Sequence, residues 1–173
     1  MLSALAAVGV VSAAAIAGGR SERAGAREER AVAAAGAGAS PLVSGYTDVH
    51  EAAASALAEW LRCEGVTLFT SGYAANVGVL QALGGEGVVL FSDALNHASI
   101  IDGCRLSRAR VEVVPHLDLD ALERALTRSS SARARWVVTE SYFSMDGDSP
   151  DLVGLRALCD RHDAGLILDE AHA

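Results

Sequence analysis

Short apolar runs alternate with amphipathic segments along most of the chain. In the amphipathic segments, apolar residues recur every three or four positions, which is typical of helices with one buried face. The apolar runs lack such spacing and are typical of buried parallel strands. Helices are expected at residues 48–63, 73–83, 97–107, 119–127 and 151–162, and strands at 66–69, 88–91, 111–114, 136–139 and 166–168. This order predicts an α/β fold, a mainly parallel sheet with flanking helices on both faces.

The pattern becomes regular from about Ala31 onward. Asp48 is the expected cap of the first helix, with Glu51 three residues later.

The segment Met1 to Gly19 is uncharged, and it lacks the basic residues that precede the apolar run of a signal peptide. Because alanine and glycine insert weakly into membranes, we expect residues 1–30 to form an amphipathic or poorly ordered extension. The chain stops shortly after the last expected strand, so we expect the sheet to be incomplete.

The charged residues limit the chemistry that the chain can perform. It has 14 basic and 22 acidic residues, a net charge of −8, which disfavours nucleic acid as a partner. All 14 basic residues are arginine, and the sequence contains no lysine. An arginine guanidinium stays protonated and cannot act as an amine nucleophile. The chain alone therefore offers neither a Schiff-base lysine nor the lysine of a phosphate loop.

The three cysteines are widely spaced along the chain. Cys63, Cys104 and Cys159 form no CxxC pair, and their number is odd, so neither a disulfide framework nor a zinc site is predicted. We expect buried free thiols, which fits a reducing, cytoplasmic location.

Polar residues or glycines follow four of the expected strands. The carboxyl ends of parallel strands meet at one edge of a sheet, which is where α/β proteins bind ligands. The four groups are Ser71–Gly72–Tyr73, Ser92–Asp93 with Asn96–His97 after them, Glu140 with Ser144, and Asp169 with His172. Each group alone has an ordinary explanation, such as a helix cap or a solvated carboxylate. Together they predict one ligand site.

Two of these groups each have a second explanation. The turn at Ser71 presents helix amides that can bind phosphate, but it is also explained as a strand-to-helix turn capped by Ser71. Residues 169–172 spell the DEAH box of ATP-driven helicases. That chemistry needs a glycine-rich phosphate loop with a lysine. The sequence has neither, so the helicase interpretation fails.

Four segments, in this order, resemble motifs of the α-oxoamine synthases, a family of pyridoxal-phosphate (PLP) enzymes. They are residues 36–46 with His50 and Glu51, residues 95–103 (LNHASIIDG), residues 143–148 (FSMDGD) and residues 169–172 (DEAH). The resemblance covers about residues 30 to 173. It implies a fold-type I PLP-dependent transferase large domain, of which residues 31–173 would be the N-terminal part. Family members hold the cofactor with a lysine well beyond the DEAH motif.

The resemblance implies roles for four residues around the cofactor. Gly72 and Tyr73 would bind the PLP phosphate through their backbone amides. His97 would stack on the pyridine face, although a histidine after asparagine is more often a residue that starts a helix. Asp169 would keep the ring nitrogen protonated, which makes the ring an electron sink.

Two further residues would act at the ring hydroxyl. Ser144 and His172 would hydrogen-bond there and tune its charge, and Glu140 would support this layer. His97, Asp169 and His172 are the expected catalytic residues, and no metal is expected. His116 and His162 match no role and are expected on the surface or in loops.

The reaction implied is a decarboxylative condensation of an amino acid with an acyl thioester, carried by CoA or a carrier protein. The motifs best match members that use L-alanine and a pimeloyl thioester in biotin synthesis, and those members are homodimers. Glycine C-acetyltransferase and 5-aminolevulinate synthase share most of the motifs. The sequence is also compatible with a membrane-attached enzyme of the serine palmitoyltransferase type and with a noncatalytic fragment. Because lysine is missing, we expect this chain alone to be inactive.

Overall fold

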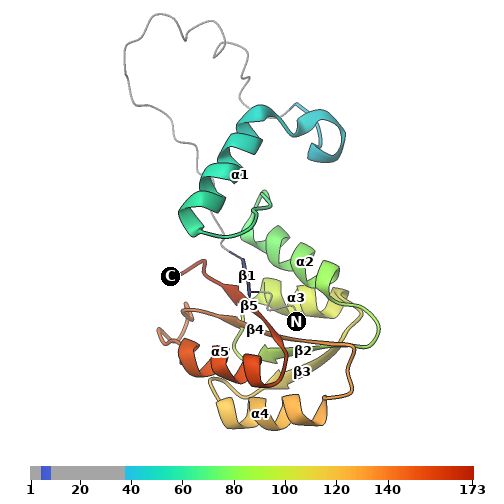
Figure 1. Cartoon of the computed structure of the whole chain (residues 1–173), viewed down its shortest axis with the longest axis vertical. Helices are drawn as coiled ribbons and strands as arrows, with labels where there is room; N and C mark the ends of the chain where they lie inside the picture. The colour runs from blue at the N-terminus through green and yellow to red at the C-terminus, as the bar shows by residue number, and fades with distance from the viewer. Residues whose placement is uncertain (1–4, 9–37) are drawn as a thin grey trace, which may run out of the picture. The chain divides into compact units, whose positions relative to one another are not determined.

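The computed structural model describes residues 5–8 and 38–173, which fall into two compact units (Figure 1). We call residues 38–68 the helical unit and residues 5–8 with 69–173 the sheet unit. Each is described by itself. The rest of the predicted extension, residues 1–30, lies outside the described residues.

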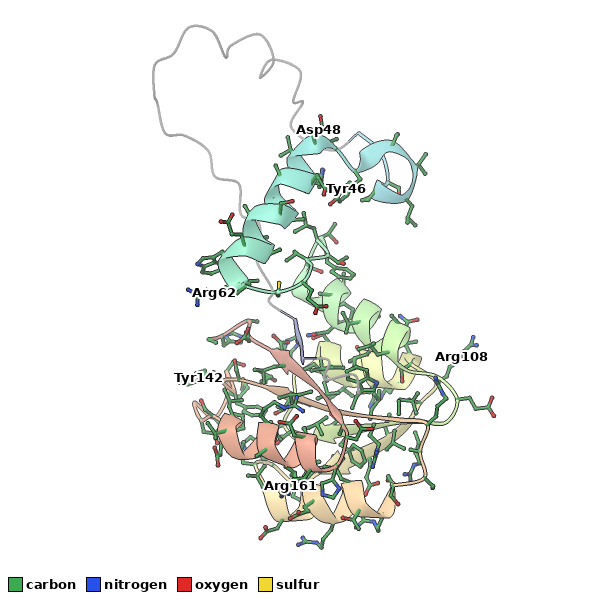
Figure 2. The ribbon with its side chains drawn as sticks, in the orientation of Figure 1. Tyr46, Asp48, Arg62, Arg108, Tyr142 and Arg161 are labelled. Carbon is green, nitrogen blue, oxygen red and sulfur yellow. The ribbon has the colours of Figure 1, made fainter. Side chains whose placement is uncertain are left out.

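The helical unit contains one short and one long helix. The short π-helix η2 spans Pro41–Gly45 and the α-helix α1 spans Asp48–Leu61, which ends at Arg62 in the left-handed conformation (Figure 2). The predicted cap was wrong, because Thr47 caps α1 and Asp48 is its first residue. The Thr47 amide donates to His50 Nδ1 over 3.2 Å, so histidine takes the part of the expected glutamate in the capping box.

The sheet unit is built on five parallel strands in the order β1-β5-β4-β2-β3. Their bounds are β1 Leu5–Val8, β2 Val88–Asp93, β3 Arg110–Val114, β4 Ala134–Glu140 and β5 Gly165–Asp169. In the pairing of β4 with β5, Glu140 lies opposite Asp169. The carboxyl ends of these two neighbouring strands therefore place two carboxyl groups side by side.

Helices cover both faces of the sheet, as the sequence pattern predicted (Figure 1). On one face α2 (Gly72–Leu83) and α3 (Ala98–Leu106) share an apolar core with Val88 and Leu90. On the other face α4 (Leu119–Arg128) and α5 (Leu152–Arg161) pack on Val89 and Phe91. Successive residues of β2 thus point to opposite faces, and both faces are apolar because both are covered.

Two parts of the chain differ from the prediction. Residues 66–69 pair with no described strand, so the strand expected there was wrong. An apolar run shows that a segment can be buried, but a strand also needs a hydrogen-bonding neighbour. Leu5–Val8, expected in an amphipathic or poorly ordered extension, instead forms β1 at the edge beside β5.

Gly103 allows α2 and α3 to lie close together. A Cβ atom added at Gly103 would stand 2.7 Å from Leu80 Cδ1 and 3.0 Å from the carbonyl oxygen of Asn76. A larger residue would therefore push the two helices apart. The final glycine of the LNHASIIDG segment is explained by this contact, which brings Asn76 of α2 against Ser99 of α3.

The cysteines follow the prediction in part. Burial raises the pKa of both Cys104 and Cys159 to about 11, as expected of unreactive buried thiols. Cys63 is exposed, contrary to expectation, because it lies just beyond the end of α1. Among the helices that the structure describes, none is both long and apolar enough to cross a lipid bilayer.

Candidate active site

The predicted site residues gather at the carboxyl ends of β2, β4 and β5. Asp169 is the last residue of β5 and only 7% exposed. Its Oδ1 accepts a hydrogen bond from the Ala171 amide over 2.9 Å. Glu140, the last residue of β4, lies opposite it. This edge of the sheet therefore carries two buried carboxyl groups.

The loop after β2 reaches the same edge. Asn96 is buried and donates from Nδ2 to Ser92 Oγ and to the Val138 carbonyl oxygen, which fastens the loop to β2 and β4. The His97 amide donates to Glu140 Oε1 over 2.6 Å. His97 is also the N-cap of α3, since its Nδ1 accepts from the Ser99 amide. The helix-start role and the nearness to the site predicted for His97 therefore coexist.

The N-terminus of α2 begins at Gly72. Ser71 caps it, because Ser71 Oγ accepts from the Ala74 amide over 3.2 Å. The Tyr73 hydroxyl donates to Asp102 Oδ2 on α3, so its side chain is engaged away from the helix end. The amides of Gly72 and Tyr73 make no hydrogen bond to other described residues, as is usual in a first helical turn.

Asn76 is a site residue that the sequence analysis missed. It lies one turn beyond Gly72 in α2, is 3% exposed, and donates from Nδ2 to Asp169 Oδ2 over 2.7 Å. The same nitrogen lies 2.9 Å from Ser99 Oγ. The sequence pattern points only to the glycine and the helix amides of the turn at Ser71. Only the fold shows that Asn76 reaches the acid of β5.

The two carboxyl groups of the site, Glu140 and Asp169, have different surroundings. Burial raises the pKa of Glu140, the hydrogen bond from the His97 amide opposes this rise, and the charge of Asp169 adds to it. Asp169 instead accepts a hydrogen bond on each of its oxygens. The pKa of Glu140 therefore lies above its usual value, while both oxygens of Asp169 are held by hydrogen-bond donors.

The last two predicted residues lie at the rim. Ser144 and His172 are both exposed, and neither side chain has a hydrogen-bond partner among the described residues. Ser144 belongs to a turn closed by the Gly147 amide donating to the Phe143 carbonyl, and Gly147 has a φ of +73°. That left-handed conformation explains the glycine of the FSMDGD segment. The roles of Ser144 and His172 stay predictions.

A second cluster, around His116, was not foreseen. His116 Nδ1 lies 2.8 Å from Asp93 Oδ1, and its Nε2 lies 3.1 Å from Asp148 Oδ2. The ring also makes an edge contact with Phe143, at a centroid distance of 4.5 Å. Because both partners are carboxylates, both ring nitrogens must donate, so the charged imidazolium fits this site. His116 is a loop residue as predicted, but it ties the 143–148 turn to the end of β2.

The His116 cluster predicts a pH dependence of stability. Burial alone would lower the pKa of His116, but hydrogen bonds and charges from Asp93 and Asp148 raise it overall. The stabilisation is then fully present below the unfolded pKa of about 6.5 and is lost as pH rises through the folded value. His116→Gln should therefore lose about 1 kcal/mol of unfolding free energy at about pH 5.5 and much less at about pH 8.5. Urea unfolding of both proteins at both pH values measures this.

His162 is the matched control for that measurement. It also lies in a loop near a carboxylate, but only Glu123 is within reach, at 3.6 Å. His162→Gln should show the smaller difference between the two pH values. An equal loss from His116→Gln at both pH values would contradict the prediction.

A small cavity lies on the α4 and α5 face of the sheet. It measures about 70 Å³, and its lining includes Asp93, Leu117, Asp118 and Asp151. Asp118 and Asp151 cap α4 and α5 and accept hydrogen bonds from their first turns. These helix ends are already satisfied by carboxylates, so they disfavour an anionic ligand. The cavity is therefore a poorer candidate than the edge around Asp169.

Comparison with known proteins identifies the family of the chain. The sequence model of the aminotransferase class I and II family matches residues 16–173. The 8-amino-7-oxononanoate synthase of Mycolicibacterium smegmatis is 55% identical over 137 residues, which are 79% of this chain and 36% of that protein. The 8-amino-7-oxononanoate synthase 1 of a Polaromonas species is 52% identical over the same share of this chain and 34% of its own length. The chain thus spans about a third of the length of these relatives.

Solved structures give the same result. A serine palmitoyltransferase from Sphingomonas wittichii matches with a TM-score of 0.76 and 36% identity, over 79% of this chain and 34% of that chain. The 8-amino-7-oxononanoate synthase of Francisella tularensis matches with a TM-score of 0.63 and 28% identity, over 74% of this chain and 36% of that chain. These matches confirm the predicted fold-type I architecture, of which the chain holds only a part. The chain belongs to the aminotransferase class I and II family and, within it, to the PLP-dependent α-oxoamine synthases.

Proposed function

We propose that the chain is the cofactor-binding part of an α-oxoamine synthase that joins L-alanine to a pimeloyl thioester with loss of carbon dioxide. The observation that carries this is the buried Asp169 carboxylate at the tip of β5, held by Asn76. A buried carboxylate favours a cationic partner such as a protonated ring nitrogen. The choice of substrates rests on the relatives named 8-amino-7-oxononanoate synthase.

The described residues fit PLP. Asp169 accepts one hydrogen bond on each oxygen, and a carboxylate has about four lone-pair directions, so it can accept another. When bound, PLP supplies a ring that accepts the electron pair left on the amino-acid Cα after deprotonation. The part of Asp169 is to remain ionised and keep a proton on the ring nitrogen.

Other residues would hold the remaining parts of the cofactor. The amides of Gly72 and Tyr73 would bind the phosphate, because helix N-terminal amides attract anions. The exposed ring of His97 would lie against the face of the pyridine. Ser144 and His172, whose side chains have no partner among the described residues, would hydrogen-bond the ring hydroxyl.

The absence of lysine limits what this chain does by itself. No side chain here can form a Schiff base with PLP, so we propose that the chain binds PLP noncovalently and does not turn over substrate alone. For the whole protein we propose an acyl thioester on CoA or a carrier protein as second substrate, a homodimer, and a cytoplasmic location.

A serine palmitoyltransferase type of reaction is the second candidate, because those structures match with TM-scores up to 0.76. Their identity is 31% to 36%. The curated 8-amino-7-oxononanoate synthases are 50% to 55% identical. The identity to these curated relatives supports L-alanine as the amino acid.

PLP titration of the chain tests the proposal. Absorbance and fluorescence quenching should show saturable binding, and borohydride treatment should leave no label on any internal residue in peptide maps. Asp169→Ala should weaken binding at least about tenfold, equal to about 1.4 kcal/mol. L-alanine should change the spectrum of the loaded chain at lower concentration than glycine or L-serine.

The control is Val153→Ala on α5, where the side chain is 81% exposed and the helix contributes no residue to the proposed PLP site. Its PLP affinity should equal that of the parent. Binding without saturation, or equal affinity in Asp169→Ala, would show that this edge is not the PLP site. A borohydride-stable label on an internal residue would overturn the noncovalent proposal.

A further inference from the structure

Four side chains from three elements form a continuous hydrogen-bonded chain at the site. Asn76 Nδ2 lies 2.7 Å from Asp169 Oδ2 and 2.9 Å from Ser99 Oγ. Ser99 Oγ in turn lies 2.7 Å from His97 Nδ1. Asn76 and Ser99 are 3% and 1% exposed, so water does not compete for these contacts. These hydrogen bonds connect the tip of β5 to the first residues of α3 through α2.

The donors and acceptors of this chain can be assigned one by one. An ionised carboxylate only accepts, so the amide nitrogen of Asn76 must face Asp169. That nitrogen carries two hydrogens, which go to Asp169 Oδ2 and to Ser99 Oγ. The Ser99 hydroxyl hydrogen is then free to point at His97 Nδ1. The Ser99 backbone amide also donates to Nδ1, over 3.2 Å.

Two donors therefore meet at one ring nitrogen. Nδ1 of His97 must offer its lone pair, and the ring proton of the neutral imidazole must sit on Nε2, because the bond made by one nitrogen sets the state of the other. Nε2 has no hydrogen-bond partner among the described residues.

We propose that Asn76 and Ser99 are positioning residues that couple the Asp169 carboxylate to His97 and hold His97 as its Nε2–H tautomer. The role of Asn76 and Ser99 in cofactor binding rests on the proposed function, in which Asp169 contacts the PLP ring nitrogen and His97 the PLP ring face. The coupling itself is a property of the cofactor-free polypeptide. Rotating one of the four side chains removes a hydrogen bond from its neighbour.

The tautomer of His97 in the cofactor-free chain is the first test. Long-range ¹H–¹⁵N NMR spectra above the pH at which the ring becomes neutral, with the signal assigned by His97→Gln, should show the Nε2–H form predominating. Ser99→Ala removes the hydroxyl donor and should raise the Nδ1–H fraction at least about twofold. Ser99→Thr keeps the hydroxyl and should restore the parent pattern.

Ser107→Ala is the matched control. Ser107 is also buried, at 3% exposed, and its hydroxyl donates to the Cys104 carbonyl at the end of α3, away from His97. The two alanine variants should lower the melting temperature similarly, but only Ser99→Ala should change the His97 tautomer. A parent chain with His97 mainly in the Nδ1–H form, or an unchanged tautomer in folded Ser99→Ala, would overturn the proposal.

PLP affinity separates this proposal from the proposed function. Asn76→Ala should weaken PLP binding at least about fivefold, and Ser107→Ala should leave it unchanged. If the parent chain does not bind PLP, the proposed function fails, while the tautomer of His97 still decides the coupling. If the parent binds PLP and folded Asn76→Ala binds it equally well, Asn76 does not position Asp169 and the proposal fails alone.

Discussion

At neutral pH the Glu140→Gln variant is expected to be more stable than the parent chain by on the order of 1 kcal/mol, because it removes a buried charge. Glu140 is 4% exposed, burial raises its pKa, and the charge of Asp169 raises it further against the hydrogen bond from the His97 amide. A carboxyl group with a raised folded pKa stabilises the fold below its unfolded pKa of about 4.5, and this contribution is lost as pH rises through the folded value. Glutamine keeps the oxygen that accepts from His97.

Denaturant unfolding at several pH values measures this effect. The advantage of Glu140→Gln should be largest at about pH 7 and vanish near about pH 4, where Glu140 is protonated in both states. Glu86→Gln is the control, because Glu86 is exposed in the turn before β2, and its effect should be small at every pH. A Glu140→Gln variant less stable than the parent at neutral pH would show that the charged form is stabilised.

The Gly165→Ala variant is expected to lose about 1–3 kcal/mol of unfolding free energy, the usual result of forcing extra volume into a packed site. Gly165 lies opposite Trp136 in the pairing of β5 with β4. A Cβ atom there would overlap with Cε3 and Cζ3 of the Trp136 ring. The indole is a rigid ring on a central strand, so relief requires the strand or the whole ring to move.

Urea unfolding followed by tryptophan fluorescence measures both the loss and the displacement of Trp136. Gly65→Ala is the matched control, since a Cβ there would meet no atom within 4 Å. That variant should be as stable as the parent or slightly more stable, because alanine restricts the unfolded chain. If Gly165→Ala were as stable as the parent, the Trp136 ring would be able to move away from position 165 without loss of unfolding free energy, and the prediction would be wrong.

Much of the fold was predictable because its signals are local. Five helices and four of the strands fall within a few residues of their predicted ranges, since periodicity in the sequence reports one-sided or two-sided burial directly. The failures are of another kind. Whether residues 66–69 or Leu5–Val8 form a strand depends on which neighbour is available, and pairing between distant segments leaves no local pattern. The cap of α1 moved by one residue, which is the usual uncertainty at helix ends.

The site was predictable where a motif marked it. The Asn96–His97 loop, Asp169 and the Gly72 turn all belong to the sheet unit, and hydrogen bonds link His97 to Asp169 through Ser99 and Asn76. Asn76 and His116 were missed because their partners lie 93 and 32 residues away. The length of a side chain and its direction in the fold decide such contacts, and spacing in the sequence does not record them.

The pairing of Asn76 with Asp169 has a consequence for how the protein is made. During synthesis α2 and α3 leave the ribosome well before β5. The side-chain amide of Asn76 therefore has no Asp169 to bind until another 93 residues have been made. Domains fold largely as units once their last essential segment emerges. A nascent chain that ends before β5 therefore lacks Asp169. PLP binding by ribosome-bound chains of increasing length would report when β5 pairs with the rest of the sheet.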